Sequence, residues 1–272
     1  MRPAASSYHA YGLELARWTR FKASDWFFRY EVYGADDLPK PASSYVWLLR
    51  NDTRTVLVDC GVSRESAAAR GLVMDRDIRD LLAQAGVDPA RVDHVVLSHL
   101  HFDHTGNIGM FPNATFSVSR AELDFWTGPF GRQPALAAPV EDSELAQVVD
   151  LLRDERLVLI DDELEILPGI RTRRVGGHTP GQTITTVNLG SSRIVLAGDA
   201  VHFYEEMRQD RLYRVFTDAL EMLRTYEHLR ELDARPDTIV VSGHDPEVMG
   251  MFEPVAEGCV DLAVPVGDTG RG

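Results

Sequence analysis

One short segment constrains the fold more than any other part of the chain, because it places four potential metal ligands within six residues. The segment follows the apolar run Val95–Leu97 and has the pattern His-x-His-x-Asp-His. A short apolar run of this kind is typical of a buried strand, so the polar side chains fall on the loop that leaves its end. Imidazole and carboxylate groups suit zinc and similar first-row ions, and a core does not bury such groups without partners. The segment therefore predicts a metal site at a strand end, formed by His99, His101, Asp103 and His104.

Three further candidate ligands stand at later strand ends: His178, Asp199 and His244. Each follows an apolar run and a glycine, so the backbone can turn sharply where the side chain is presented. Side chains at the ends of different strands can converge on one edge of a sheet. Seven ligands exceed the needs of one ion and suit two ions that share a carboxylate. The sequence therefore predicts a dinuclear metal centre.

Apolar runs and helical periods alternate along the chain and predict a mixed fold. A hairpin is expected from 45–49 and 55–59, and helices are expected over 74–85, 141–152 and 218–232. Further strands are expected over 92–97, 114–118, 157–160, 170–175, 183–187, 193–197 and 238–241. Ser119–Glu122 and Asp218–Glu221 have the pattern of capping boxes that open helices. Hairpins followed by mixed strands and helices favour packed sheets with helices outside.

Composition and charge limit the possible partners. The chain has 272 residues, of which 44% are hydrophobic and 26% charged, and its formal net charge is −14. We expect one domain over 1–272, with a core at about 45–250, an aromatic extension over 1–44 and a short peripheral tail after Pro254. The absence of clustered Lys and Arg argues against nucleic acid as a partner.

No apolar run approaches the roughly 20 residues of a membrane span, and no signal peptide is apparent, so we expect a cytoplasmic protein with no membrane partner. Cys60 and Cys259 are too few for a disulfide scaffold.

The ligand motif and the later His, Asp and His, in this order, resemble the metallo-β-lactamase superfamily over roughly Tyr45–His244. The resemblance implies an α/β (α+β) fold, an αβ/βα sandwich of two mixed β-sheets with helices on the outer faces and the metals at one edge. It implies that one metal is held by His99, His101 and His178, and the other by Asp103, His104 and His244, with Asp199 bridging. It also matches Asp59 to the family's aspartate that orients a metal-binding group.

Within the superfamily, the run His99–Asn107 followed by Phe111–Ala114 is most similar to the N-acyl homoserine lactonase-like branch. This resemblance implies a quorum-quenching hydrolase with two Zn²⁺ ions, although Fe, Mn or Co would suit the same ligands. A hydroxide bridging the metals would open a small lactone ring. The branch has a tyrosine three residues after the bridging aspartate, whereas this chain has His202 there and Tyr204 two residues later. Either side chain can donate a hydrogen bond, so both His202 and Tyr204 are candidate catalytic residues. The metal-ligand candidate Asp103 is the third candidate catalytic residue.

Several alternatives stay open on the sequence. The substrate could be another small lactone, such as a 4-pyridoxolactone-like compound, or a thioester as in glyoxalase II. Asp199 stands where true β-lactamases usually have Cys, and His101 stands where flavodiiron proteins have Glu, so both of these branches are disfavoured. A non-catalytic metal sensor is a further hypothesis. The aromatic segment 18–33 would be an edge strand or extension, a pocket wall or a homodimer contact, and the loops 127–139 and 200–214 would complete the substrate wall.

Overall fold

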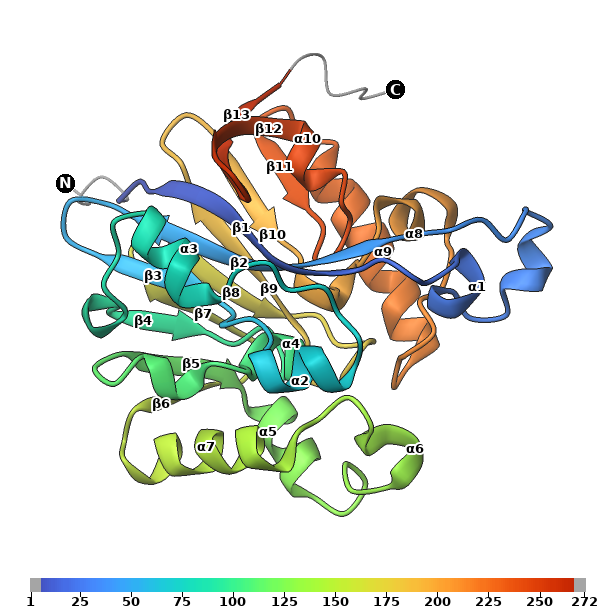
Figure 1. Cartoon of the computed structure of the whole chain (residues 1–272), viewed down its shortest axis with the longest axis horizontal. Helices are drawn as coiled ribbons and strands as arrows, with labels where there is room; N and C mark the ends of the chain where they lie inside the picture. Colours follow the sequence, from blue (N-terminus) through green and yellow to red (C-terminus); the bar gives the residue numbers. More distant parts are fainter. Residues whose placement is uncertain (1–5, 267–272) are drawn as a thin grey trace.

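Two β-sheets packed face to face form the centre of the molecule, which we describe from a computed structural model for residues 6–266 (Figure 1). The larger sheet has eight strands in the order β12-β13-β1-β2-β3-β4-β5-β6, and the smaller has five in the order β11-β10-β9-β8-β7. Both sheets are mixed. In the larger sheet β3 to β6 pair in parallel and β1 to β3 pair antiparallel. In the smaller sheet β10 and β11 pair in parallel and the other neighbours pair antiparallel. The expected sandwich of two mixed sheets is confirmed.

The strands are short, and most predicted ones are present within a few residues of their expected bounds. The larger sheet contains β1 (His9–Trp18), β2 (Ala42–Arg50), β3 (Thr55–Val58), β4 (His94–Val96), β5 (Thr115–Ser119), β6 (Leu157–Ile160), β12 (Phe252–Ala256) and β13 (Cys259–Pro265). The smaller sheet contains β7 (Glu163–Leu167), β8 (Ile170–Arg174), β9 (Thr183–Asn188), β10 (Arg193–Leu196) and β11 (Thr238–Val241). Nearly all of β2 is buried, because its side chains face the other sheet on one side and the helical layer on the other.

Helices cover the outer faces of the sandwich (Figure 1). They are α1 (Ala23–Trp26), α2 (Arg64–Ala69), α3 (Ile78–Gln84), α4 (Phe102–Thr105), α5 (Arg120–Thr127), α6 (Pro134–Ala137), α7 (Asp142–Arg153), α8 (Tyr204–Gln209), α9 (Ala219–Asp233) and α10 (Val248–Met251). Buried side chains from α2, α3, α5 and α7 belong to one hydrophobic cluster with the larger sheet, and those from α8 and α9 belong to a second cluster that includes residues of both sheets. In the part of the chain that the structure describes, no helix is long and apolar enough to cross a membrane.

Both chain ends contribute strands to the larger sheet, contrary to the expected extension and peripheral tail. Strand β1 pairs with β2 along its whole length and also with β13, which in turn pairs with β12. Of the alternatives for the segment 18–33, an edge strand is not formed beyond Trp18, and the segment contains α1 and a 3-10 turn at Tyr30–Tyr33. The sequence did not indicate this arrangement because the pairing of β1 with β13 joins segments from opposite ends of the chain.

Neither of the two predicted capping boxes forms completely in the structure. At α9, Asp218 accepts hydrogen bonds from the backbone N–H groups of Leu220 and Glu221, as expected of an N-cap. At α5, Ser119 makes no side-chain cap. Neither glutamate completes its box: Glu221 accepts from the backbone N–H of Gly177, and Glu122 is directed into the core. Both glutamates therefore contact the loops that carry candidate metal ligands.

Candidate metal centre

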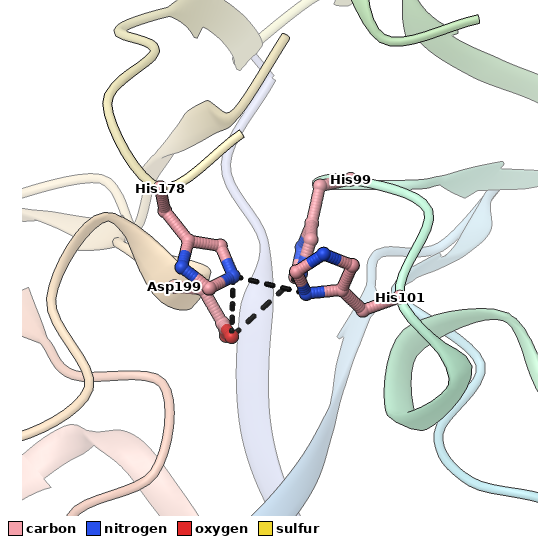
Figure 2. Close-up of side chains that lie close together, drawn as sticks. All are labelled: His99, His101, His178 and Asp199. Atoms are coloured by element: carbon pink, nitrogen blue, oxygen red, sulfur yellow. Dashed lines mark hydrogen bonds and ion pairs between the residues drawn. The ribbon is translucent and has the colours of Figure 1, made fainter. Parts of the chain in front are cut away.

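Seven buried side chains converge at one edge of the sandwich, and they are the seven candidate ligands of the sequence analysis. His99, His101, His178 and Asp199 form one group, and Asp103, His104 and His244 form another, each with ligand atoms within 4.8 Å of one another. Figure 2 shows the first group, with the histidines from two separate loops directed toward Asp199. The side chains come from the loop after β4 with α4, and from the loops after β8, β10 and β11. Strand ends that are distant in sequence thus form one site.

The carboxylate of Asp199 lies between the two groups, and each of its oxygens faces one of them. Its Oδ2 is 3.3 Å from Nε2 of His178 and 3.6 Å from Nε2 of His99. Its Oδ1 is 3.1 Å from Nε2 of His104 and 2.9 Å from Nε2 of His244. This placement would allow the carboxylate to be shared by two ions.

Three of the histidines are held by hydrogen bonds at the nitrogen that faces away from the cluster. Nδ1 of His104 lies 2.8 Å from the carboxylate of Asp59. The Nδ1 groups of His178 and His244 donate to the carbonyl oxygens of Val215 and Ser43, at 2.8 and 2.7 Å. Each bond occupies Nδ1 and leaves Nε2 directed into the cluster, which is how a metal-binding histidine is presented.

The buried nitrogens fit a divalent metal. Among the described residues, Nε2 of His99 and Nε2 of His104 have no hydrogen-bond partner although they are buried. Burial, together with neighbouring imidazoles, holds the pKa of both His99 and His101 well below the usual range, so these two rings are neutral. Neutral imidazoles and carboxylates, with buried lone pairs directed at a common point, are the donor set of a divalent cation site.

Asp59 is positioned as the resemblance implied. It follows β3 with a left-handed backbone (φ 63°), a strained conformation for a residue with a side chain. Besides its contact with His104, its carboxylate accepts hydrogen bonds from Ser98, at 2.7 Å from the backbone N–H and 2.8 Å from the hydroxyl. The next residue, Cys60, is fully buried, and burial raises its thiol pKa well above the usual range. A thiolate nucleophile is therefore not available here, and Cys60 and Cys259 are both free.

His202 lies at the same site. Its Nε2 is 3.0 Å from Oδ2 of Asp199, and its Nδ1 is 3.4 Å from Oε2 of Glu206. Its ring stacks on Tyr213 with centroids 3.3 Å apart and planes at 11°. Burial lowers the pKa of His202, but the carboxylates of Asp199 and Glu206 outweigh this effect and raise the pKa to about 9.

Tyr204, the other candidate for the position of the lactonase tyrosine, points elsewhere. Its side chain is buried in the hydrophobic cluster that includes residues of both sheets, and its hydroxyl donates to the carbonyl oxygen of Val240 at 3.2 Å. It does not line the cavity above the metal site, whereas Tyr213 does. The sequence analysis did not single out Tyr213, because no local pattern marks it and its contact with His202 depends on the path of the loop after α8.

A cavity of about 240 Å³ opens over the cluster. Its polar floor consists of six predicted site residues, and its walls are mostly aromatic or aliphatic. The floor is formed by His101, Asp103, His178, Asp199, His202 and His244, and the walls by Trp18, Phe21, Trp26, Arg70, Phe102, Pro139, Phe203, Tyr213 and Val215. Trp18 and Trp26 lie edge to face, and the indole N–H of Trp26 donates to the carbonyl of Lys40 at 2.8 Å. The aromatic N-terminal segment is thus a pocket wall.

The chain is similar in sequence to curated proteins that have names. The N-acyl homoserine lactonase AttM of Rhizobium radiobacter is 31% identical over 191 residues, which cover 68% of this chain and 71% of that protein. An N-acyl homoserine lactonase of a Bacillus species is 27% identical over 218 residues, covering 75% and 81% of the two chains.

Solved structures share the fold. An N-acyl homoserine lactone hydrolase with the product N-hexanoyl-L-homoserine bound has a TM-score of 0.72 and 19% identity, covering 91% of this chain and 97% of that one. The dizinc quorum-quenching lactonase AidC has a TM-score of 0.69 and 18% identity, covering 98% and 97%. A family model described as the metallo-beta-lactamase superfamily matches residues 39–244, which include all seven clustered ligands. The chain therefore belongs to the metallo-β-lactamase superfamily.

Proposed function

We propose that the chain is a dinuclear-metal hydrolase that opens a small lactone ring of the N-acyl homoserine lactone type. The observation that carries this proposal is the position of Asp199 between two groups of buried ligands at the floor of an apolar cavity. Relatives named as N-acyl homoserine lactonases support the same substrate class.

The proposed metals are two zinc ions, a choice supported by the dizinc lactonase of the same fold. His99, His101 and His178 would hold one ion, and Asp103, His104 and His244 the other, with Asp199 shared. When bound, such a pair supplies a water nucleophile at neutral pH and polarises the ester carbonyl. Three of the histidine rings are preoriented for this purpose, because Asp59, Val215 and Ser43 hold their outward nitrogens.

His202 is proposed as the residue that stabilises charge on the reacting oxygen. Glu206 holds Nδ1, so Nε2 is directed over the floor of the cavity beside Asp199. From there the ring would donate a hydrogen bond to the oxyanion or to the departing alkoxide. Tyr213 stacks on the ring and fixes its plane, which keeps the donor in place without rearrangement during the reaction.

The size of the cavity favours a compact substrate. At about 240 Å³ it lies below the roughly 300 Å³ at which sites for drug-sized ligands begin. The walls contributed by Trp18, Trp26 and Phe203 suit a short apolar chain attached to the ring. We therefore expect butanoyl- and hexanoyl-homoserine lactones to be better substrates than dodecanoyl-homoserine lactone.

A substrate panel tests the proposal. Proton release by zinc-loaded protein would be followed on the three acyl-homoserine lactones, an unsubstituted γ-lactone, a thioester and a β-lactam. The expected result is chelator-sensitive turnover of the lactones with preference for short chains. Folded, zinc-loaded protein that hydrolyses the thioester and none of the lactones would contradict the proposed substrate class.

A further inference from the structure

Glu122 is a buried carboxylate that the proposed reaction does not use. It lies in the first turn of α5 and has no exposed surface. A buried carboxylate is costly unless it is well hydrogen-bonded, so its partners indicate why it is there.

Its two oxygens join the two loops that carry the ligands of one metal group. Oε1 accepts a hydrogen bond from the backbone N–H of Leu100 at 3.0 Å, and Leu100 lies between His99 and His101. Oε2 accepts from the backbone N–H of Gly181 at 2.9 Å, three residues after His178. One side chain thus links the loop after β4 to the loop after β8.

Two other contacts make this link rigid. The indole N–H of Trp126 donates to Oε1 of Glu122 at 2.6 Å, and the ring of Trp126 lies against His101 with centroids 5.6 Å apart. Gly181 packs directly on Glu122, and a methyl group at 181 would collide with the backbone and Cβ of Glu122. A larger side chain at position 181 would therefore force the loop of His178 to move.

A second link between the same segments lies on the β9 side. The backbone N–H and the hydroxyl of Thr183 both donate to the carbonyl oxygen of Ser98, at 3.0 and 3.1 Å. The two loops are therefore held both before His99 and after it. Apart from Glu122, the described residues join His101 to the loop of His178 only through the two rings themselves, whose Nδ1 and Nε2 atoms lie 3.0 Å apart.

We propose that Glu122 is a positioning residue that sets the spacing between His99, His101 and His178 by holding Leu100 and Gly181 on one carboxylate. The inference rests on the proposed two-metal site. Groups that orient metal ligands typically change metal affinity by about 10- to 100-fold when they are replaced. The effect should be confined to the site of these three histidines, because Glu122 makes no hydrogen bond to the loop bearing His244.

The test uses Glu122→Gln, which keeps the shape of the side chain and replaces one acceptor oxygen by an NH₂ group. In either orientation the amide leaves one loop without its acceptor. Zinc affinities would be measured in competition with a chromophoric chelator, and ¹⁵N-histidine NMR would show which imidazoles lose metal. We expect one of two zinc sites to weaken about 10- to 100-fold, with loss of the zinc-bound signals of His101 and His178 before those of His104 and His244.

A matched control is Glu144→Gln. Glu144 is also a buried carboxylate beside the site, but it accepts only from the hydroxyl of Thr105, at 2.6 Å, and joins no loops. We expect both zinc affinities of this variant to match those of the unaltered protein.

The outcomes separate the two proposals. Glu122→Gln protein that is folded and binds both zinc ions with unaltered affinity would overturn the role of Glu122 and leave the hydrolase intact. Unaltered protein that binds fewer than two zinc ions would instead contradict the proposed function. If Glu122→Gln does not fold, the same zinc affinities would be measured for Trp126→Phe. This variant keeps an aromatic ring beside His101 and removes one hydrogen-bond donor to Glu122. A smaller weakening of the same site supports the proposal, and unchanged affinity overturns it.

Discussion

Hydrogen bonds at the outward nitrogens decide which atom each imidazole presents to the metals. Asp59, a backbone carbonyl of Val215 and one of Ser43 hold three of the rings. The clustering of these side chains was predictable because the His-x-His-x-Asp-His segment and the later strand ends stand out in the sequence. The carbonyl partners Val215 and Ser43 could not be predicted, because every residue has a backbone carbonyl oxygen and the sequence does not show which one a histidine will contact.

We predict different effects on kcat for substitutions at His202 and Tyr204. His202→Phe keeps an aromatic ring against Tyr213 but removes the nitrogen beside Asp199. We expect kcat to fall by about 10²-fold, the usual effect of losing one oxyanion donor, with two metals still bound. Steady-state kinetics with metal analysis of the same sample checks this expectation.

Tyr204→Phe is the comparison. Its hydroxyl contacts Val240 rather than the cavity, so kcat should stay within about twofold while stability falls by roughly 1 kcal/mol for the lost hydrogen bond. A large loss of kcat in this variant, with His202→Phe unaffected, would reverse the assignment.

Asp199→Ala tests the shared ligand. Because each oxygen of Asp199 faces a different ligand group, its removal should reduce bound zinc below two ions per chain and abolish turnover. Inductively coupled plasma analysis of dialysed protein measures the stoichiometry. Two tightly bound ions and full activity would show that Asp199 does not bridge.

At the level of elements, strand ends bring the ligands together and the loops between them supply what the sequence could not reveal. Strand and helix positions followed from apolar runs and from the helical period, as at β6 and α7. The contacts of Glu122 and Glu221 with the loop of His178 could not be predicted. A glutamate at this position has the same sequence pattern whether it caps its own helix or contacts a distant loop. The terminal strands β1 and β13 were missed for the same reason, since pairing across the whole chain leaves no local mark.

The β4–β5 pair contains a pH-sensitive contact away from the metals. His94 is buried, with its ring nitrogens 2.7 Å from the hydroxyl of Thr115 and 2.9 Å from that of Ser117. Burial lowers the pKa of His94 from 6.5 to about 4. Between these values the unfolded chain binds a proton that the folded chain does not, so stability falls as pH drops through this window.

The expected size of this effect is about 3 kcal/mol between pH 7 and pH 4, at 1.36 kcal/mol for each unit of pKa. Other buried histidines titrate too, so the comparison is with His94→Gln, which can bond both hydroxyls but has no proton to gain. Urea unfolding of metal-free protein should show a shallower loss of stability in the variant. Parallel curves for the two proteins would refute the assignment to His94.

At the level of the whole molecule, metal binding and folding should be coupled. The ligands come from loops of both sheets, so ions that bind only the folded chain hold the two halves of the sandwich together. Zinc at about 100 times its dissociation constant contributes roughly 2.7 kcal/mol per site. We expect excess chelator to lower Tm by roughly 5 °C or more, measured by differential scanning calorimetry. An unchanged Tm after complete removal of metal would contradict this coupling.

The most direct test of the two-metal hydrolase is a zinc titration of activity. Metal-free protein would receive zero, one and two equivalents of Zn²⁺, and proton release from hexanoyl-homoserine lactone would be measured at each step. Because Asp199 lies between two ligand groups, we predict that turnover rises to its maximum only with the second equivalent, at a kcat/KM above roughly 10⁴ M⁻¹s⁻¹. Folded protein that binds two zinc ions and releases no protons from this lactone would contradict the account.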